Sequence, residues 1–298
     1  MNTKHKDELA DLARQVQLLC HPPLQPTESR HIQALESFAG YIPTDIRTLY
    51  AIHNGYPIAD HDQRGQIQIR LLPIEEVLAE NDSIIDSIAT PNTERPPIVF
   101  FWTDDESNWA GIFTEGPLKD YITVVDHDEP IIRPSFSNVL AFYASLIGCT
   151  QHDTHDGLIY LPEIPTELPR ANDEPHLLDH ERTLSNYFLE RAEAAQSNDQ
   201  RLDMMCCALR LIPAADTHKI LPLLETDDMF VPELAIEVVT RRQYTPAIPS
   251  LVNLARRGRP NGDTAAISAL RHWNHPEAQQ ALESLRGTVN EHLERWLD

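Results

Sequence analysis

The chain has 298 residues, of which 41% are hydrophobic and 23% charged, and its formal net charge is -22. This length and composition predict a globular protein with room for two domains. No stretch approaches the roughly 20 apolar residues that a membrane helix needs, so we expect no membrane partner. Because the first residues lack the apolar run of a signal peptide, we expect a cytoplasmic location.

The negative charge is concentrated in the first half of the chain. Residues 1–160 hold 24 Asp and Glu against 10 Lys and Arg, whereas residues 199–298 hold nearly equal numbers. An acidic surface repels nucleic acid and steers basic partners toward it, so we expect no direct nucleic-acid binding. The same charge would also serve solubility alone, and charge does not separate these two interpretations.

The four cysteines give no sign of a metal or redox motif, because no Cys-x-x-Cys occurs. We interpret them as buried thiols of a reducing compartment. They are Cys20, Cys149, Cys206 and Cys207.

Three amphipathic helices are expected first, carrying apolar side chains at helical spacing over residues 9–19, 32–38 and 42–50. The third is the most clearly bounded. Pro43 stands at its start, Thr44 or Asp45 can cap its first turn, and Asn54-Gly55 can end it in a left-handed conformation.

Strands follow these helices. Residues 65–72 alternate as a half-buried strand, and Pro73 opens a short helix. Residues 98–102, 109–113 and 121–125 have the spacing of an antiparallel meander. A last helix follows Ser135 or Ser137, either of which can cap it. Residues 1–150 are therefore predicted to be an α+β domain, an antiparallel sheet with helices on one face.

An ordered set of motifs in this region resembles the SUKH superfamily, the Smi/Knr-type domain. Its members carry a Pro-x-Asp helix, an Asn-Gly turn and a Leu-Pro turn with two glutamates, followed by an Asp-His-Asp turn and a Ser-Phe helix. The corresponding segments are Ile42-Pro43-Thr44-Asp45-Ile46-Arg47, His53-Asn54-Gly55, Leu72-Pro73-Ile74-Glu75-Glu76, Val124-Val125-Asp126-His127-Asp128 and Ser135-Phe136.

The resemblance covers residues 28–148 and has two departures. Tyr56 replaces a usual glycine, and Ile46 replaces a common tyrosine. The motif residues expected to have structural roles are Pro43, Asp45, Asn54 and Gly55. The resemblance implies a binding module rather than an enzyme. Bacterial members look like immunity proteins encoded beside secreted or contact-delivered toxins, often nucleases, and fungal members resemble signalling regulators.

The rest of the chain is predicted to be a linker and a helical-repeat domain. Residues 151–180 are rich in proline and acidic residues, which is typical of an extended connector. Residues 181–298 are expected to be all-α. A shift of 31 residues aligns Met205 with Ile236 and Ile267. Paired short helices of this length must stack to bury their apolar faces, and the period resembles short HEAT-like repeats.

The candidate partner-binding residues are carboxylates in the turns of the meander and three aromatic residues near them. Acidic turns can pair with Lys and Arg of a partner, and Trp and Tyr dominate binding hot spots. Strand alternation places Trp102 with Phe100 on one face and Phe101 on the other, without saying which face is buried. The set is Tyr56, Trp102, Asp104, Asp105, Glu106, Trp109, Asp126, Asp128 and Glu129.

Alternative chemistry has weaker support. Two close carboxylates could act as acid and base, but Asp favours turns for conformational reasons. His152, Asp153, His155 and Asp156 form at most half of a metal site, in a predicted loop between the domains. The basic residues Arg241, Arg242, Arg256, Arg257 and Arg259 fit a mixed-charge surface better than an anion site. We therefore expect no catalytic residue, metal or cofactor.

These features predict a non-enzymatic immunity protein that binds and neutralises a cognate toxin, a basic nuclease being the expected class. A second protein could bind the helical repeats. The alternative is an adaptor or regulatory protein of the Smi/Knr type that joins partners through its two modules.

Overall fold

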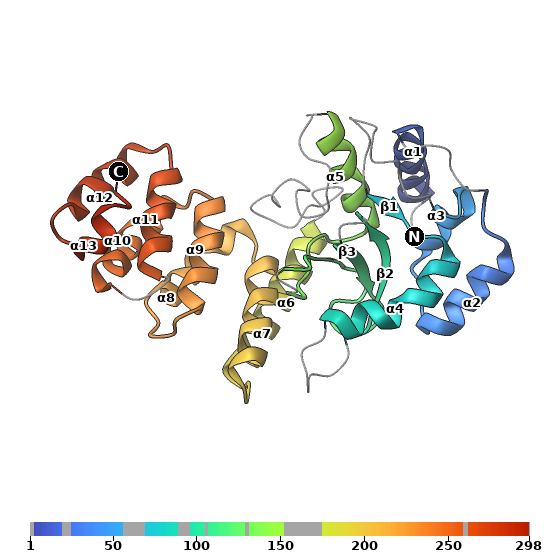
Figure 1. The fold of residues 1–298 in the computed structure, drawn as a ribbon, viewed down its shortest axis with the longest axis horizontal. Helices are drawn as coiled ribbons and strands as arrows, with labels where there is room; N and C mark the ends of the chain where they lie inside the picture. Colours follow the sequence, from blue (N-terminus) through green and yellow to red (C-terminus); the bar gives the residue numbers. More distant parts are fainter. Residues whose placement is uncertain are drawn as a thin grey trace. The chain divides into compact units, whose positions relative to one another are not determined.

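The computed structural model describes residues 3–19, 25–55, 69–88, 96–104, 107–128, 131–151, 175–258 and 262–297. The chain divides into two compact units, Met1–Asp173 and Glu174–Asp298. Figure 1 shows a small sheet in the first unit and helices in both.

The first unit begins with the three helices that the sequence predicts: α1 (Thr3–Leu19), α2 (Ser29–Ala39) and α3 (Thr44–Ile52). Gly40 ends α2 in the left-handed conformation. The predicted cap of α3 is wrong, because Pro43 is the N-cap residue and no side chain caps the helix. Thr44 and Asp45 lie within the first turn, where the negative Asp45 carboxylate interacts favourably with the positive end of the helix dipole.

The sheet contains β1 (Arg70–Leu71), β2 (Ile98–Thr103), β3 (Trp109–Phe113) and β4 (Ile122–Val125). Every neighbouring pair is antiparallel in the order β1-β2-β3-β4, which confirms the predicted meander. Of the strand predicted over residues 65–72, Arg70–Leu71 is a strand, and residues 65–68 lie outside the described residues.

A β-bulge in β2 changes which face its aromatic residues use. Val99 pairs with Ile112, but the register shifts between Phe100 and Trp102, so Trp102 pairs with Ala110. The extra residue places Trp102 in the same core as Val99 and Phe101. The predicted alternation, with Phe100 and Trp102 on one face, is therefore wrong.

The helix α4 (Ile74–Ile88) runs along the edge of β2 and is longer than the short helix predicted after Pro73. The Phe100 backbone N–H donates to Asn81 Oδ1 at 2.8 Å, where a further strand would otherwise pair. The Leu72 N–H donates to the Phe101 carbonyl at 2.8 Å. The side chain of Asn81 therefore satisfies a backbone donor that β1 is too short to reach.

The helix α5 (Val139–Gln151) completes the first unit. Asn138 Oδ1 accepts the Ala141 N–H at 2.9 Å, so Asn138 caps α5 in place of the predicted serines. Ser135 Oγ instead accepts the Val124 N–H of β4 at 3.0 Å. Side chains from α1 to α5 and from one face of the sheet form a single core, as the predicted α+β class requires.

The second unit is a series of short helices. α6 begins inside the stretch that the sequence assigned to a linker. The elements are α6 (Pro175–Glu193), α7 (Asn198–Leu211), η2 (Ala214–Ile220), α8 (Leu221–Leu224), α9 (Val231–Arg241), η3 (Thr245–Ala247), α10 (Ile248–Arg257), α11 (Gly262–His272), α12 (Pro276–Leu285) and α13 (Glu291–Glu294).

The repeated positions of the sequence are the core positions of these helices. Nearly all equivalent residues of successive helix pairs are buried, which explains the 31-residue period by packing. Three sets are buried throughout: Met205, Ile236 and Ile267; Ala208, Val239 and Leu270; and Ile220, Leu251 and Leu282. In the fourth set, Leu254 and Leu285 are buried and Leu223 is half-buried. Leu293 and Leu297 join the same core at the C-terminal end.

Candidate partner-binding rim

Two acidic turns meet at one end of the sheet. Thr103 pairs with Trp109, and Trp109 pairs with Val125. Because these pairs lie at the strand ends, the turns that follow Thr103 and Val125 are neighbours. We define the rim as Asn108, Trp109, Asp126, His127 and Asp128.

A hydrogen-bond chain joins the two turns of the rim. The Asp104 carboxylate accepts from the Asn108 backbone N–H at 3.2 Å and from Asn108 Nδ2 at 2.8 Å. Asn108 Oδ1 accepts the His127 N–H at 3.1 Å and lies 2.9 Å from His127 Nδ1. Since a backbone N–H can only donate, the amide atom that it meets is the oxygen. His127 Nδ1 therefore carries hydrogen, and this contact fixes the imidazole ring.

Two rim carboxylates are available to solvent. The Asp126 side chain is 35% exposed and the Asp128 side chain 83%. Asp126 Oδ1 accepts the Asp128 backbone N–H at 2.8 Å. The His127 ring lies between them, with Nε2 3.3 Å from Asp128 Oδ1. The rim thus presents negative charge in a turn that its own hydrogen bonds hold in shape.

Asp104, like Asn108, is not exposed to a partner. Its side chain is buried, and both carboxylate oxygens accept hydrogen bonds from Asn108. A partner lysine or arginine would have to break these bonds to reach it. The prediction of Asp104 as a partner-binding residue is therefore corrected, because the turn folds back on this carboxylate.

The two tryptophans have different environments. Trp102 is 1% exposed, its Nε1 donates to Tyr143 Oη at 3.3 Å, and its ring packs on Phe142. It is a core residue, and its prediction as a surface anchor is corrected. Trp109 is half-buried at the rim and packs against the core only in part. Trp109 is thus the tryptophan that a partner can contact.

Several predicted residues lie outside the described part of the chain. Among the partner-binding candidates these are Tyr56, Asp105, Glu106 and Glu129, and among the weighed metal ligands His152, Asp153, His155 and Asp156.

Two of the family-like motifs contact each other at the start of α4. Asn54 Oδ1 accepts the Ile74 N–H at 3.1 Å, and Asn54 Nδ2 donates to Glu75 Oε2 at 3.0 Å. Gly55 has a φ of 81°, and a Cβ there would lie 2.6 Å from the Leu71 carbonyl oxygen. Asn54 therefore binds the N-terminus of α4. A side chain at residue 55 would push the segment after α3 away from the start of α4.

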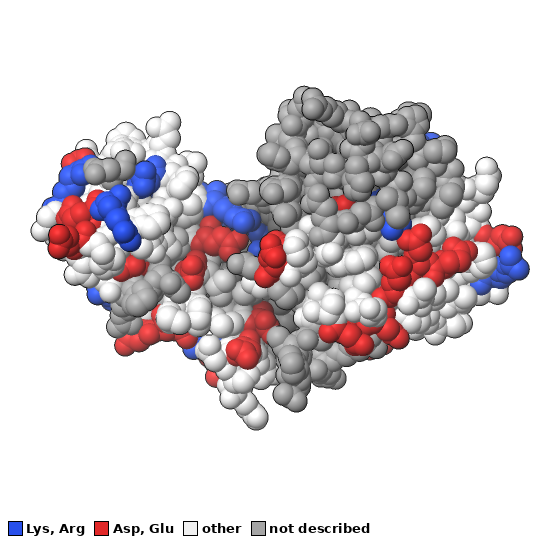
Figure 2. All heavy atoms as spheres, in the orientation of Figure 1, with Lys and Arg blue, Asp and Glu red and all other residues white. Residues whose placement is uncertain are grey.

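An acidic face on α4 was not expected from the sequence. This helix carries five acidic and no basic residues. Figure 2 shows Asp and Glu side chains gathered over α4 and the neighbouring α2. Because the sequence predicts only a short helix after Pro73, Asp82 and Asp86 were not recognised as part of one helical surface. The residues are Glu75, Glu76, Glu80, Asp82 and Asp86.

The arginines of the second unit are used between its helices. Arg242 donates to the Ile212 carbonyl at 2.6 Å, to the Pro213 carbonyl at 3.2 Å and to Thr217 Oγ1 at 2.8 Å. Arg257 donates to the Glu225 carboxylate at 2.7 Å. These contacts favour the mixed-charge interpretation of the predicted basic cluster, whose Arg259 lies outside the described residues.

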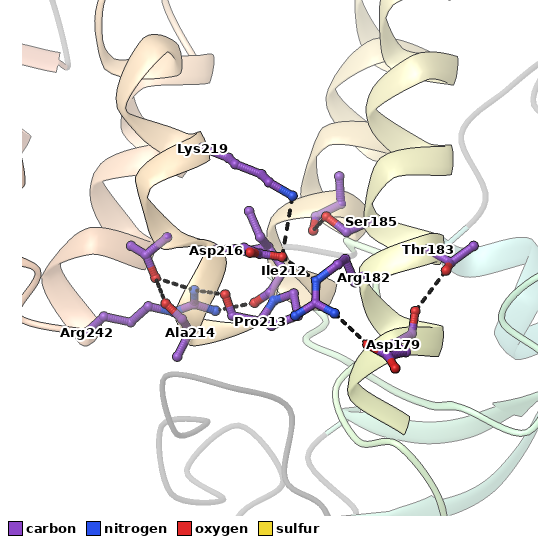
Figure 3. Close-up of polar contacts among 12 residues, drawn as sticks. Asp179, Arg182, Thr183, Ser185, Ile212, Pro213, Ala214, Asp216, Lys219 and Arg242 are labelled. Atoms are coloured by element: carbon purple, nitrogen blue, oxygen red, sulfur yellow. Dashed lines mark hydrogen bonds and ion pairs between the residues drawn. The ribbon is translucent and has the colours of Figure 1, made fainter. Parts of the chain in front are cut away.

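The turn that Arg242 contacts is also held from α6. Figure 3 shows Arg182 between Asp179 and Asp216, with Arg242 reaching the same η2 segment from α9. Arg182 lies 2.6 Å from each carboxylate, and its hydrogen bond holds the pKa of Asp216 below its usual value. Two arginines thus tie η2 to the helices before and after it.

No protein-family model and no curated protein matches this chain. Among the helices that the structure describes, none is long and apolar enough to cross a membrane.

Proposed function

We propose that the chain is a non-enzymatic protein of the SUKH type that binds and neutralises a basic toxin in the cytoplasm, and that this toxin is a nuclease. The observation that carries the proposal is the rim, where the exposed Asp128, the partly exposed Asp126 and the half-buried Trp109 lie at the same end of the sheet. A nuclease must present basic side chains to hold nucleic acid. An acidic protein that covers those side chains competes directly with the substrate.

The rim has the chemistry of an interface centre. A tryptophan supplies a large apolar contact, and surrounding polar groups exclude water from it. The Asp104–Asn108–His127 chain holds the turn before a partner arrives, so less conformational entropy is lost on binding. The acidic face of α4 adds a long-range field that speeds encounter with a positive partner.

The first experiment is co-expression of the chain with the product of its neighbouring gene. Affinity capture should recover one basic protein that arrests growth when expressed alone, and co-expression should restore growth. Capture of that protein without restored growth would leave binding but remove neutralisation. Capture of other proteins alone would reject the toxin proposal.

Charge reversal then locates the contact face. The double variant Asp126→Lys/Asp128→Lys should slow association and weaken binding, most strongly at low salt, because the Debye length is about 10 Å at 0.1 M. Glu80→Lys/Asp86→Lys makes the same charge change on α4 and serves as the matched control. Equal effects of the two variants would indicate general steering, and unchanged binding of the rim variant would reject the rim as the contact.

A separate observation favours the adaptor alternative. Met229 and Phe230 are exposed apolar neighbours in the turn before α9. Asp228 accepts both the Phe230 and Val231 N–H groups and contacts Arg201 at 2.7 Å, so the turn is held in shape. A second protein could use these side chains as an anchor. If Met229→Ser/Phe230→Ser abolishes capture and the rim variant does not, the second unit is the binding module.

A further inference from the structure

The Asn54-Gly55 pair between α3 and α4 is open to a chemical change that needs only water and a base in solution. Glycine has no Cβ, so the Gly55 backbone nitrogen can approach the amide carbon Cγ of the Asn54 side chain. Once this nitrogen has lost its proton, it attacks Cγ. The N–Cγ bond forms and the Cγ–Nδ2 bond breaks, and Nδ2 takes up a proton and leaves as ammonia. Water then opens the succinimide ring to an aspartyl or an isoaspartyl residue at position 54.

In the folded protein, both polar atoms of the Asn54 amide are bound to α4. Oδ1 accepts the Ile74 N–H at 3.1 Å, and Nδ2 donates to Glu75 Oε2 at 3.0 Å. The Asn54 backbone N–H donates to the Gln25 carbonyl at 2.9 Å, which fixes the backbone next to this amide. Ring closure makes Cγ tetrahedral and expels Nδ2, so it breaks the contact with Glu75 and displaces the contact with Ile74. The reaction therefore requires that residue 54 first separates from α4.

We propose that Asn54-Gly55 is a site of spontaneous deamidation, and that this reaction irreversibly breaks the junction of α3 and α4 once the junction has opened. The packing around Gly55 supports the irreversible step. A Cβ at residue 55 would lie 2.6 Å from the Leu71 carbonyl oxygen and 2.6 Å from the Pro73 nitrogen. An isoaspartyl residue adds a methylene group to the backbone just before Gly55, and the packed segment has no room for it.

The aspartyl product is also unfavourable here, for an electrostatic reason. Its second carboxylate oxygen takes the place of Nδ2 and faces the Glu75 carboxylate, where the present contact is 3.0 Å. A hydrogen-bond donor is thus replaced by an acceptor, and two negative charges become neighbours. Both products therefore weaken the contact that protects Asn54. The proposal rests on these contacts alone and does not depend on toxin binding.

The rate of deamidation tests whether the junction protects Asn54. Asn261→Gln is the parent protein, because it removes the second Asn-Gly pair of the chain. The full-length protein is incubated at mildly alkaline pH with and without guanidinium chloride, and mass spectrometry follows the peptide that contains residue 54. Because two hydrogen bonds must open first, the folded protein should react about tenfold or more slowly than the unfolded chain.

Two substitutions on α4 separate this protection from a general effect of charge. Glu75→Ala removes the acceptor of Nδ2 and should speed the reaction of the folded protein about threefold or more. Glu80→Ala removes another exposed carboxylate of the same helix and should react like the parent. Rates in guanidinium chloride correct for effects on the intrinsic chemistry. Equal rates in the folded and unfolded parent, or equal rates for Glu75→Ala and the parent, would overturn the proposed protection.

Refolding of the deamidated chain tests the irreversible step. Anion exchange separates this chain from the parent because the reaction adds a negative charge, and labelling by an isoaspartate methyltransferase identifies the isoaspartyl form. This form should unfold at a lower temperature than the parent and be cleaved faster by protease between α3 and α4. Asn54→Asp provides the aspartyl product for a separate measurement. An isoaspartyl chain that regains the thermal midpoint of the parent would overturn the proposal.

Discussion

Acidification should destabilise the first unit through His53. This residue follows α3 and is 0% exposed. Burial disfavours the charged imidazolium and lowers its pKa from 6.5 to about 4, and a hydrogen bond with the Gly55 backbone opposes this shift only in part. In the unfolded chain the same ring takes up a proton near its ordinary pKa.

The sign and size of the effect follow from this difference. Between pH 6.5 and about 4 the unfolded state binds a proton that the folded state excludes, so the free energy of unfolding falls as the pH falls. One pKa unit corresponds to about 1.4 kcal/mol, and the full shift therefore costs about 3 kcal/mol by pH 4. Below that pH both states are protonated, and His53 contributes no further loss.

The assay is urea unfolding at pH values from 7.5 to 4, followed by the fluorescence of Trp102 and Trp109. Trp273→Phe and Trp296→Phe in every sample restrict the signal to the first unit. In the His53→Gln protein, the free energy of unfolding should fall by about 3 kcal/mol less between pH 7.5 and 4 than in its parent. His218→Gln changes an exposed histidine of the second unit and should leave it unaltered. Parallel curves for the parent and His53→Gln would refute the burial argument.

Three further sets of substitutions test the packing. Gly55→Ala should destabilise the first unit by about 2 kcal/mol or more, because the added Cβ clashes with the backbone at a residue that already has a left-handed φ. Gly40 also has a positive φ, 69°, but no atom lies within 4 Å of its Cβ position, so Gly40→Ala should cost only about 1 kcal/mol. Equal losses of stability in urea unfolding would contradict the clash. Arg242→Met removes three hydrogen bonds and should lower the stability of the second unit by about 1–3 kcal/mol. Hydrogen exchange of the η2 amides measures this loss. Unchanged exchange would show that the three bonds do not stabilise the unit. Trp102→Ala should cost about 3–5 kcal/mol of folding stability. Compared with Trp102→Ala, Trp109→Ala should lower the folding stability less and the partner affinity more. The opposite result would make Trp102 the contact residue and Trp109 the core residue.

The positions of α1 to α3 could be predicted because the apolar spacing that defines them is a local signal. Apolar spacing identifies α1 to α3, and Gly40, in the left-handed conformation, ends α2 two residues after the predicted apolar range. The strands β2 to β4 follow from apolar runs separated by turn residues. These signals lie within a few residues of the element that they define, so tertiary packing does not override them.

The bulge in β2 could not be predicted, because it depends on the partner strand. One extra residue between Phe100 and Trp102 moves Trp102 to the other face, and only the register with β3 reveals it. The same limit applies to Asp104. Its acidic neighbours predict exposure, but Asn108 turns its carboxylate inward. The spacing of apolar and polar residues along the chain does not predict hydrogen bonds between side chains across a turn.

The sequence predicts that the helix after Pro73 ends at Asn81 and leaves residues 82–97 open between helix and loop, whereas α4 continues to Ile88. Asn favours turns in isolation, but here its side chain bonds to the edge of β2 while its backbone remains helical. Consequently the acidic residues after it belong to one helix face. The contact of Asn81 with β2 thus lets the helix continue past Asn81 and extends the acidic surface.

The motif residues and the rim residues have separable roles. Pro43 is buried at the start of α3, and Asn54 and Gly55 join α3 to α4, so these residues specify the fold. Asp126 and Asp128 are accessible and contribute little to the core. Substitutions in the motif should therefore lower stability and reduce binding only as unfolding proceeds, whereas substitutions in the rim should reduce binding at full stability.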